Sequence, residues 1–450
     1  MSADLTQLLE QVKLEAHPSQ HLGPILFEEQ AYAYVLYDHT LSEYCSFCLK
    51  PPYKRLLRCS GCKTLWFCDQ NCQRQAWPMH KHECVALQHY DLTTGEPHYE
   101  VRFLGRMFIQ QYLDSKGTED AQNDDENAPK VCKRKLSDLA DHLNESLLIP
   151  ERNLEYLMTA KMVKQYLQTF EGPHPETREI MRMESMCDVN LFLIKNEQQQ
   201  NIGRGLFLEL SRFNHSCLPT AHVYNGKPSP SPRFTLLVHY RDVSLDVDNN
   251  TPQNKDACTC GQKEKCAAYL ASIHTISYVD SMLNIQERQH ILRTRKFFEC
   301  KCKRCTDTDV FGPECSFRCP NPKCESGYVP YIHGLGDWSL KGVCMKCMHS
   351  KIGQKSWELC EHVLLDTELA FKLWDDKFKY FGLKDINAHY LEFEPTAKRC
   401  IQYLNPKSLL YFKVCRIMAE YALQTNRIVD HVYWHTKCDK ETAKKLRVNL

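Results

Sequence analysis

Hydrophobic residues follow two periodicities along this chain, and the changes between them mark the expected elements. Apolar and aromatic β-formers are concentrated at 25–37, which predicts a strand. Apolar positions with helical spacing at 98–113, 136–148 and 154–167 predict three helices. In the third of these helices one face carries Leu154, Leu157, Met158 and Met162. We expect these helices to serve packing rather than chemistry.

The second half of the chain is predicted to begin with strands and end with helices. Residues 190–196 and 272–279 are expected to be strands, and the turn Asn225-Gly226 between 221–224 and 234–240 predicts a hairpin. After Ser356 helical periodicity with aromatic residues predicts two or three helical hairpins.

Polar segments and one short helix complete the predicted organisation. The acidic stretch 115–130 is nearly free of aliphatic residues and predicts a loop or disordered insert. A second polar insert is expected at 244–271, and a short helix is expected at 5–12.

Composition narrows the class of protein. The chain has 450 residues, a length that favours about two to four domains. Its 57 Lys and Arg nearly balance its 56 Asp and Glu, which gives no global argument for nucleic acid or an anionic membrane as partner. Residues 1–20 lack the apolar run of a secretory signal, so we expect a soluble, intracellular protein without a membrane span. In that reducing compartment its 25 cysteines are expected to be metal ligands and buried thiols rather than disulfides.

Eight closely spaced cysteine and histidine residues form the strongest motif. Their spacings fit two closed tetrahedral zinc sites, and a segment of this size has too small a core to fold without metal. His82 is an alternative to one of these ligands, His80. The full set is Cys45, Cys48, Cys59, Cys62, Cys68, Cys72, His80 and Cys84.

Further cysteine groups follow downstream. Cys300, Cys302 and Cys305 supply only three thiolates, so a tetrahedral zinc needs a fourth ligand, for which Cys217 is the candidate. Such a metal would join the Asn214-His215 segment to the segment containing Tyr278. The pairs Cys319, Cys324 and Cys344, Cys347 are typical of a zinc ribbon. A further metal site is an open hypothesis for Cys258, Cys260 and Cys266, with Cys315 as a speculative fourth ligand.

Taken together, these residues resemble a known family. The order Gly203-Arg204-Gly205, Asn214-His215-Ser216-Cys217, Ile276-Ser277-Tyr278 and then Cys300-x-Cys302-x2-Cys305 is similar to the SET domain of protein lysine methyltransferases. The eight upstream ligands resemble a MYND finger, and the combination resembles the SET and MYND domain (SMYD) family over residues 1–350. In such fingers the ligands interleave, which pairs Cys45, Cys48, Cys68 and Cys72 on one zinc and Cys59, Cys62, His80 and Cys84 on the other.

The resemblance implies an α+β fold. A β-rich SET domain would be interrupted by the MYND zinc finger and followed by a zinc-bound post-SET segment and an α-helical C-terminal domain resembling tetratricopeptide repeats. The expected parts are the start of the SET domain (1–44), the finger (45–84), a helical insert (85–189), the SET core (190–299, with the polar insert 244–271), the post-SET cluster (300–305), a ribbon-like segment (306–350) and the helical domain (351–450).

The resemblance also implies an activity and a set of site residues. The activity is methyl transfer from S-adenosylmethionine to lysine side chains of histone or non-histone proteins, with Tyr278 as catalytic residue. Phe192 and Ser211 would line the lysine channel, and Lys296 stands where close relatives have an aromatic residue. The expected cofactor contacts are Asn190, Asn214, His215, Tyr278 and Phe298. Zinc would number two ions in the finger, one in the post-SET cluster and one more at 319–347.

Two alternatives remain open. The position that matches the family's Gly-x-Gly cofactor loop holds Gln11-Val12-Lys13, whose side chains obstruct a close backbone approach. This favours a catalytically impaired scaffold that docks partner peptides. At the finger, these peptides would contain proline. The weaker alternative is DNA binding through the basic cluster Lys54, Arg55, Arg58 and Lys63. A monomer in both nucleus and cytoplasm is expected.

Overall fold

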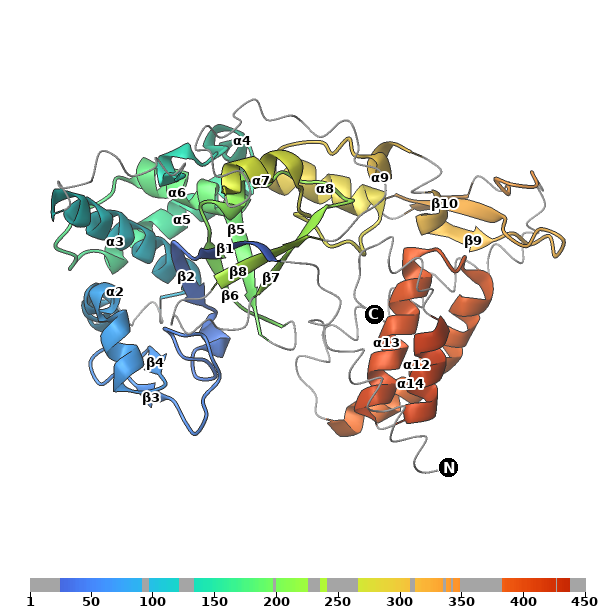
Figure 1. Ribbon diagram of the computed structural model, residues 1–450, viewed down its shortest axis with the longest axis horizontal. Coiled ribbons are helices and arrows are strands. Elements are labelled where there is room, and N and C mark those ends of the chain that lie inside the picture. The colour runs from blue at the N-terminus through green and yellow to red at the C-terminus, as the bar shows by residue number, and fades with distance from the viewer. Residues whose placement is uncertain are drawn as a thin grey trace.

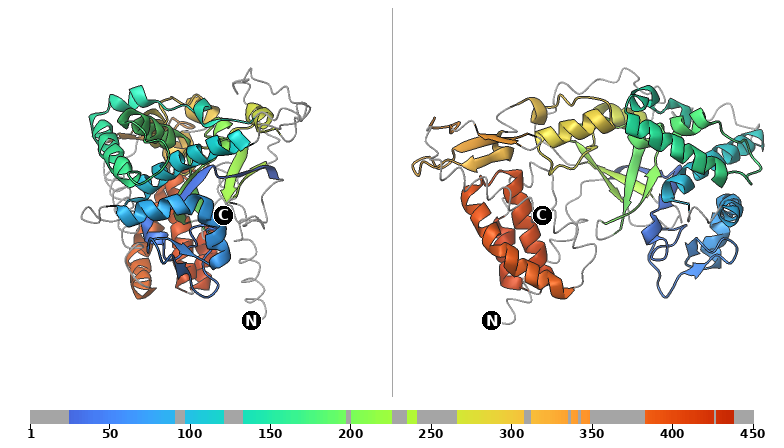
Figure 2. Two further views of the ribbon diagram at one scale, coloured as in Figure 1. Left: turned by 90° about the vertical axis from the view of Figure 1, so that its left-hand side faces the viewer. Right: turned by 180° about the vertical axis from the view of Figure 1, so that it is seen from behind.

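A computed structural model describes most of the chain in an elongated arrangement. The described residues are 25–90, 97–120, 133–196, 200–225, 235–240, 266–307, 312–334, 337–340, 343–348, 383–425 and 427–437. Strands occupy the middle, the finger and a group of helices lie at one end, and the C-terminal helices lie at the other (Figure 1). The view from behind shows the same order reversed (Figure 2). The helix expected at 5–12 and the departure at Gln11-Val12-Lys13 lie outside the described residues.

Two three-stranded sheets form the centre. In the first, β8 (Thr235–Tyr240) lies between β1 (Ile25–Gln30) and β7 (Ala221–Asn225), all antiparallel, and the expected hairpin of β7 and β8 is confirmed. In the second, β6 (Asn201–Leu206) lies between β2 (Ala33–Leu36) and β5 (Leu191–Lys195). The strand predicted at 25–37 is confirmed as β-structure but is divided into β1 and β2, which pair in different sheets.

Glycine at the start of the Gly203-Arg204-Gly205 motif is required by strand packing. A Cβ at Gly203 would lie 2.2 Å from the backbone oxygen of Val35 on the neighbouring strand β2. No real side chain tolerates that approach, so glycine lets β2 and β6 pair closely. The motif therefore has a structural explanation within the sheet.

Helices cover the sheets on the finger side. They are α2 (Gln70–His89), α3 (Tyr99–Asp120), α4 (Leu143–Leu147), α5 (Pro150–Tyr166) and α6 (Thr177–Asn190). The helix α3 continues six residues into the stretch 115–130, so that part of the loop prediction was wrong. The helix expected at 136–148 is interrupted: Leu136–Asp138 is a 3-10 turn, and His142 before α4 adopts a left-handed conformation with φ of 50°.

The buried face of α5 differs from the predicted one. Leu154 and Met158 are 61% and 57% exposed, and Leu157 is also largely exposed. The residues that pack inward are Tyr156, Ala160 and Val163, against α3 and α6. The apolar stripe in the sequence did not identify the packing face, because an equally regular stripe of aromatic and small residues runs beside it.

The segment leading to Tyr278 is not a strand. Residues Ala267–Ile273 form the helix α7, and after it only Ile276 makes an isolated bridge, a parallel one with His215. The helix α8 (Ile285–Arg295) follows, capped by the side chain of Asn284, which accepts a hydrogen bond from the backbone N–H of Glu287. The helix α9 (Lys303–Thr306) contains the last cysteine of the post-SET group.

A small sheet and three helices complete the chain. The strands β9 (Ser316–Arg318), β10 (Tyr328–Gly334) and β11 (Asp337–Leu340) are antiparallel. The helices α12 (Leu383–Tyr403), α13 (Leu409–Gln424) and α14 (Ile428–Lys437) pack in sequence around a core that includes Trp434. Within the described residues no helix is long and apolar enough to cross a membrane. The α+β prediction with a helical C-terminal part is confirmed.

Candidate active site and metal centres

The structure brings each of the predicted four-ligand groups together. In every group the candidate ligand atoms lie within 4.8 Å of one another. A tetrahedral zinc with bonds of about 2.3 Å to sulfur separates its sulfurs by about 3.8 Å. The separations here are 3.6 Å for Cys48–Cys68, 3.8 Å for Cys59–Cys84, 3.5 Å for Cys217–Cys305 and 3.6 Å for Cys319–Cys347. This donor set suits zinc, and the groups could hold one ion each.

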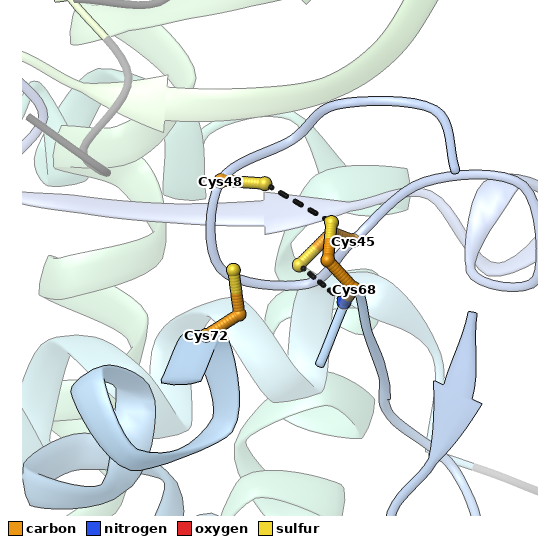
Figure 3. A group of neighbouring side chains, drawn as sticks. All are labelled: Cys45, Cys48, Cys68 and Cys72. Carbon is orange, nitrogen blue, oxygen red and sulfur yellow. Dashed lines mark hydrogen bonds between the residues drawn. The ribbon is translucent and has the colours of Figure 1, made fainter. Parts of the chain in front are cut away.

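The finger shows the interleaved arrangement. Cys45 and Cys48 come from one loop, Cys68 follows β4 (Trp66–Phe67), and Cys72 lies in the first turn of α2, where the four side chains converge (Figure 3). The second group contains Cys59, Cys62, His80 and Cys84. The alternative ligand His82 points elsewhere, because its ring packs edge-on against Tyr112 and Phe170.

A buried ion pair connects the second finger group to the central sheet. His80 Nε2 lies 3.4 Å from Cys59 Sγ, and its Nδ1 lies 3.7 Å from Glu83 Oε2. Both carboxylate oxygens of Glu83 accept hydrogen bonds from Arg106, which also donates to the backbone oxygen of Tyr34 on β2. Burial would raise the pKa of Glu83, but the Arg106 guanidinium lowers it to about 2, so the carboxylate stays charged.

The Cys217 group lies directly beside the Asn214-His215 motif. Cys217 comes from the loop after that motif, and Cys300, Cys302 and Cys305 follow α8. The backbone N–H of Ile276 donates to Asn214 O at 2.9 Å, and that of Ser216 donates to Ile276 O at 3.0 Å. The metal group and these two bonds hold the Asn-His segment against the segment that carries Tyr278.

His215 and Tyr278 are joined by direct contacts. The Tyr278 N–H donates to His215 Nδ1 at 3.0 Å, which places the imidazole proton on Nε2, 3.2 Å from Cys217 Sγ. The Tyr278 hydroxyl donates to Phe213 O at 2.6 Å. Burial raises the pKa of Tyr278 to about 12, although Arg134 opposes the shift, so the phenol keeps its proton at neutral pH.

Tyr278 forms part of the wall of a cavity of about 260 Å³. Of the predicted residues, Asn190, Phe192 and Ser211 also line it. Asn214, His215 and Phe298 are not among the lining residues; the rings of His215 and Phe298 lie 5.2 Å and 6.3 Å from the Tyr278 ring. The structure thus places Asn190, Phe192, Ser211 and Tyr278 on one cavity, and the rings of His215 and Phe298 beside Tyr278.

Sequence reasoning missed several residues of this cavity. Lys195, Val223 and Ser277 line it, and Arg134 donates to Ser211 Oγ at 3.0 Å. A strand pattern could have indicated Lys195, because it is the last residue of β5. No local signal points to Arg134, which comes from a distant loop. Lys296 also lines the cavity and lies 5.6 Å from the centre of the Tyr278 ring.

The remaining cysteine predictions have separate outcomes. Cys319, Cys324, Cys344 and Cys347 converge beside β9 and β10, as expected for a ribbon. Cys258 and Cys260 lie outside the described residues. Cys315, the speculative ligand, instead packs against the core of the C-terminal helices.

Comparisons with known proteins agree with this geometry. The MYND finger family matches residues 45–84. The chain is 27% identical over 297 residues to the human protein named histone-lysine N-methyltransferase SMYD3, which covers 64% of this chain and 57% of that protein. The chain is therefore similar to proteins of the SET and MYND domain family.

The similarity to two other proteins covers similar lengths. The bovine N-lysine methyltransferase SMYD2 is 25% identical over 315 residues, covering 68% of this chain and 60% of that protein. SET domain-containing protein 14 of Caenorhabditis elegans is 27% identical over 290 residues, covering 64% and 57%. This chain therefore matches somewhat less than two thirds of the length of these relatives.

Proposed function

We propose that this chain is a protein-lysine N-methyltransferase that uses S-adenosylmethionine as methyl donor and acts on lysines of histone or non-histone proteins. The observation that supports this best is the position of Tyr278. Its phenol is held by Phe213 O, its backbone by His215, and its ring forms a wall of the cavity lined by Asn190 and Phe192. Relatives named as lysine methyltransferases provide independent support.

The residues present fit the methyl donor. The cavity of about 260 Å³ is just below the range of about 300–1,000 Å³ common for small-molecule sites, and it combines aromatic walls with a few polar groups. The Asn190 side chain is held in place, because its Nδ2 donates to Ala140 O and Met186 O and leaves the amide oxygen for a ligand. Asn190 would hold the cofactor at the cavity, with His215 and Phe298 supporting that wall through their rings beside Tyr278. The cofactor supplies an activated methyl group when bound.

The chain's own residues prepare the lysine. Phe192 and Tyr278 give the cavity apolar walls, and desolvation there disfavours the charged form of an entering amine. A neutral amine has the lone pair that methyl transfer needs. The phenol of Tyr278 and the backbone oxygen of Phe213 fix one edge of the cavity and orient the amine by hydrogen bonding. Zinc held by the Cys217 group would keep the two segments in register.

The substitution Tyr278→Phe tests this assignment. It should remove most methyl transfer to a lysine peptide pool while leaving the affinity for S-adenosylmethionine nearly unchanged, because the lost hydroxyl bonds only Phe213 O among described contacts. Tyr32→Phe is the matched control, since that hydroxyl donates to Asp114 at 2.8 Å, away from the lining residues of the cavity. Turnover like that of the wild type in Tyr278→Phe would refute the role.

A second function, docking of partner peptides by a catalytically impaired SMYD scaffold, is favoured by one observation. The finger exposes Tyr53 almost fully, at 98%, and also Leu57 and Trp77. Aromatic residues that face solvent on a small rigid module suit proline-containing peptides. Binding of such peptides without turnover in the wild type supports this function, whereas turnover that Tyr278→Phe abolishes excludes an impaired enzyme.

A further inference from the structure

Lys296 enters the cavity from the end of a helix. It directly follows α8, and its backbone N–H donates to Leu292 O at 3.0 Å. Its side chain is one of the lining groups, together with Phe192, Ser211 and Tyr278. A lysine of the chain itself thus lines the cavity to which the proposed function assigns the lysine of the substrate.

Two backbone carbonyls hold the Lys296 amine. Nζ donates to Val189 O at 2.7 Å and to Asp188 O at 3.3 Å. An ammonium has three N–H bonds to satisfy and no acceptor, whereas a neutral amine has two N–H bonds and one lone pair. These two carbonyls satisfy both N–H bonds of a neutral amine, whereas the third N–H of an ammonium would have only the face of the Tyr278 ring, whose centre is 5.6 Å away. The neutral amine would keep its lone pair for another partner.

The electrostatic surroundings agree with this count. Burial lowers the pKa of Lys296 to about 8, although the Asp188 carboxylate attracts the charged form. The Asp188 carboxylate is already engaged, because it accepts a hydrogen bond from the Tyr156 hydroxyl at 2.7 Å. The neutral form of Lys296 is thus within reach near physiological pH, as a nucleophilic amine requires.

We propose that Lys296 is itself a methylation site, modified within its own cavity by the same methyl donor. The inference rests on the proposed function. The lone pair of the neutral Nζ forms the N–C bond to the donor's methyl group while the C–S bond breaks. The bonding electrons of C–S stay on sulfur, which changes from a sulfonium to a neutral thioether, and water takes the proton released from nitrogen. Confinement in one cavity supplies the proximity.

Mass mapping of the full, zinc-loaded chain tests this site. The protein is mapped as purified and again after incubation with S-adenosylmethionine carrying a trideuterated methyl group, with a pool of lysine peptides in the same tube. Wild type should carry methyl groups on Lys296, and Lys296→Arg should lose them while Lys164→Arg, at an exposed lysine on α5 away from the lining residues, should keep them. The labelled fraction per unit time should not change when the protein is diluted, because the step is intramolecular.

A second readout needs no methyl transfer. An amine-specific reagent such as formaldehyde with a borohydride labels accessible lysines, and S-adenosylhomocysteine should protect Lys296 several-fold while leaving Lys301 unprotected. Label on the peptides with none on Lys296 would overturn the inference and leave the proposed function intact. Labelling of Lys296 that slows on dilution would overturn the intramolecular step. Neither protection nor label anywhere would overturn both.

Discussion

The finger and the region around Tyr278 use the same cysteine chemistry over different distances. In the finger all eight candidate ligands fall within 45–84, so one short segment can fold around its own metals. The post-SET group instead joins Cys217 to cysteines more than eighty positions later, and the cavity draws on β5, the loop before Asn214 and the end of α8. A metal would therefore stabilise a module in the first case and assemble a site in the second.

The largest expected difference between the two regions comes from removing one zinc ligand from each and measuring cofactor binding. Cys217→Ser should lose one zinc and, with it, measurable cofactor binding, since structural zinc contributes about 10–16 kcal/mol and the stability of a domain is about 5–15 kcal/mol. Cys48→Ser should also lose one zinc but retain cofactor binding. Metal content by mass spectrometry and calorimetric titration measure the two effects.

The control for ligand removal is Cys315→Ala, because that thiol packs against the C-terminal helices and joins none of the four groups. It should keep the full zinc content. If Cys217→Ser binds cofactor as the wild type does, the post-SET group is not what assembles the cavity.

Glu314 tests how firmly the post-SET segment is fixed. Its carboxylate accepts from Arg304 at 2.6 Å and from Arg288 at 3.1 Å, all three side chains are buried, and Arg304 also donates to Ser281 O. Glu314→Gln leaves two buried guanidinium groups without a carboxylate, which should lower the free energy of unfolding by about 3–5 kcal/mol. Denaturant unfolding measures this loss.

The matched control for Glu314 is an exposed ion pair. Glu299→Gln removes the partner of Arg293 on the surface, where the cost is about 0–1 kcal/mol. Equal losses in the two variants would show that the buried network does not secure this segment.

Substitution of Glu29 should give the smallest effect, a change in how the free energy of unfolding depends on pH. Its carboxylate accepts from the N–H groups of Glu209 and Leu210 at 2.9 and 2.8 Å, just before Asn214. Burial raises its pKa from 4.5 to about 7, opposed by these backbone bonds. The unfolded chain releases this proton at lower pH than the folded one, so this group's contribution to stability falls as pH rises from about 4.5 to about 7.

Glu29→Gln should flatten that part of the pH dependence of unfolding, whatever its effect on absolute stability. Glu28→Gln, at an exposed neighbouring position on β1, is the matched control. A slope unaffected by Glu29→Gln would mean that this carboxyl does not titrate between its two values. The contrast is with Glu83 in the finger, which Arg106 keeps charged throughout.

The metal-ligand groups could be predicted from local residue spacing. The packing of helices and strands could be predicted less well. The hairpin of β7 and β8 was predicted from two strand segments bounded by Asn-Gly and Pro-Ser, and such sequence signals are local. The inward face of α5 was missed because Leu154, Leu157 and Met158 form an apolar stripe that no described helix covers, and burial is decided by neighbours. The strand expected at 272–279 was wrong. Helix α7 extends to Ile273, and after it only Ile276 makes an isolated bridge.

The site was predicted only in part for a similar reason. Phe192, Ser211 and Tyr278 were named from the family pattern, and the structure places them on one cavity. Arg134 and the carbonyls that hold Lys296 were not named, because these contacts join segments far apart in the sequence and no local period predicts such an approach. The role of Lys296 depends on Val189 O, a backbone atom that side-chain patterns do not report.

Titration of the purified, zinc-loaded chain with S-adenosylmethionine in a calorimeter tests the central claim most directly. The proposed methyltransferase requires saturable one-to-one binding at micromolar cofactor, lost in Cys217→Ser and retained in Tyr278→Phe. No detectable heat at millimolar cofactor, and no competition by S-adenosylhomocysteine, would contradict it and indicate a peptide-docking protein built on the same fold.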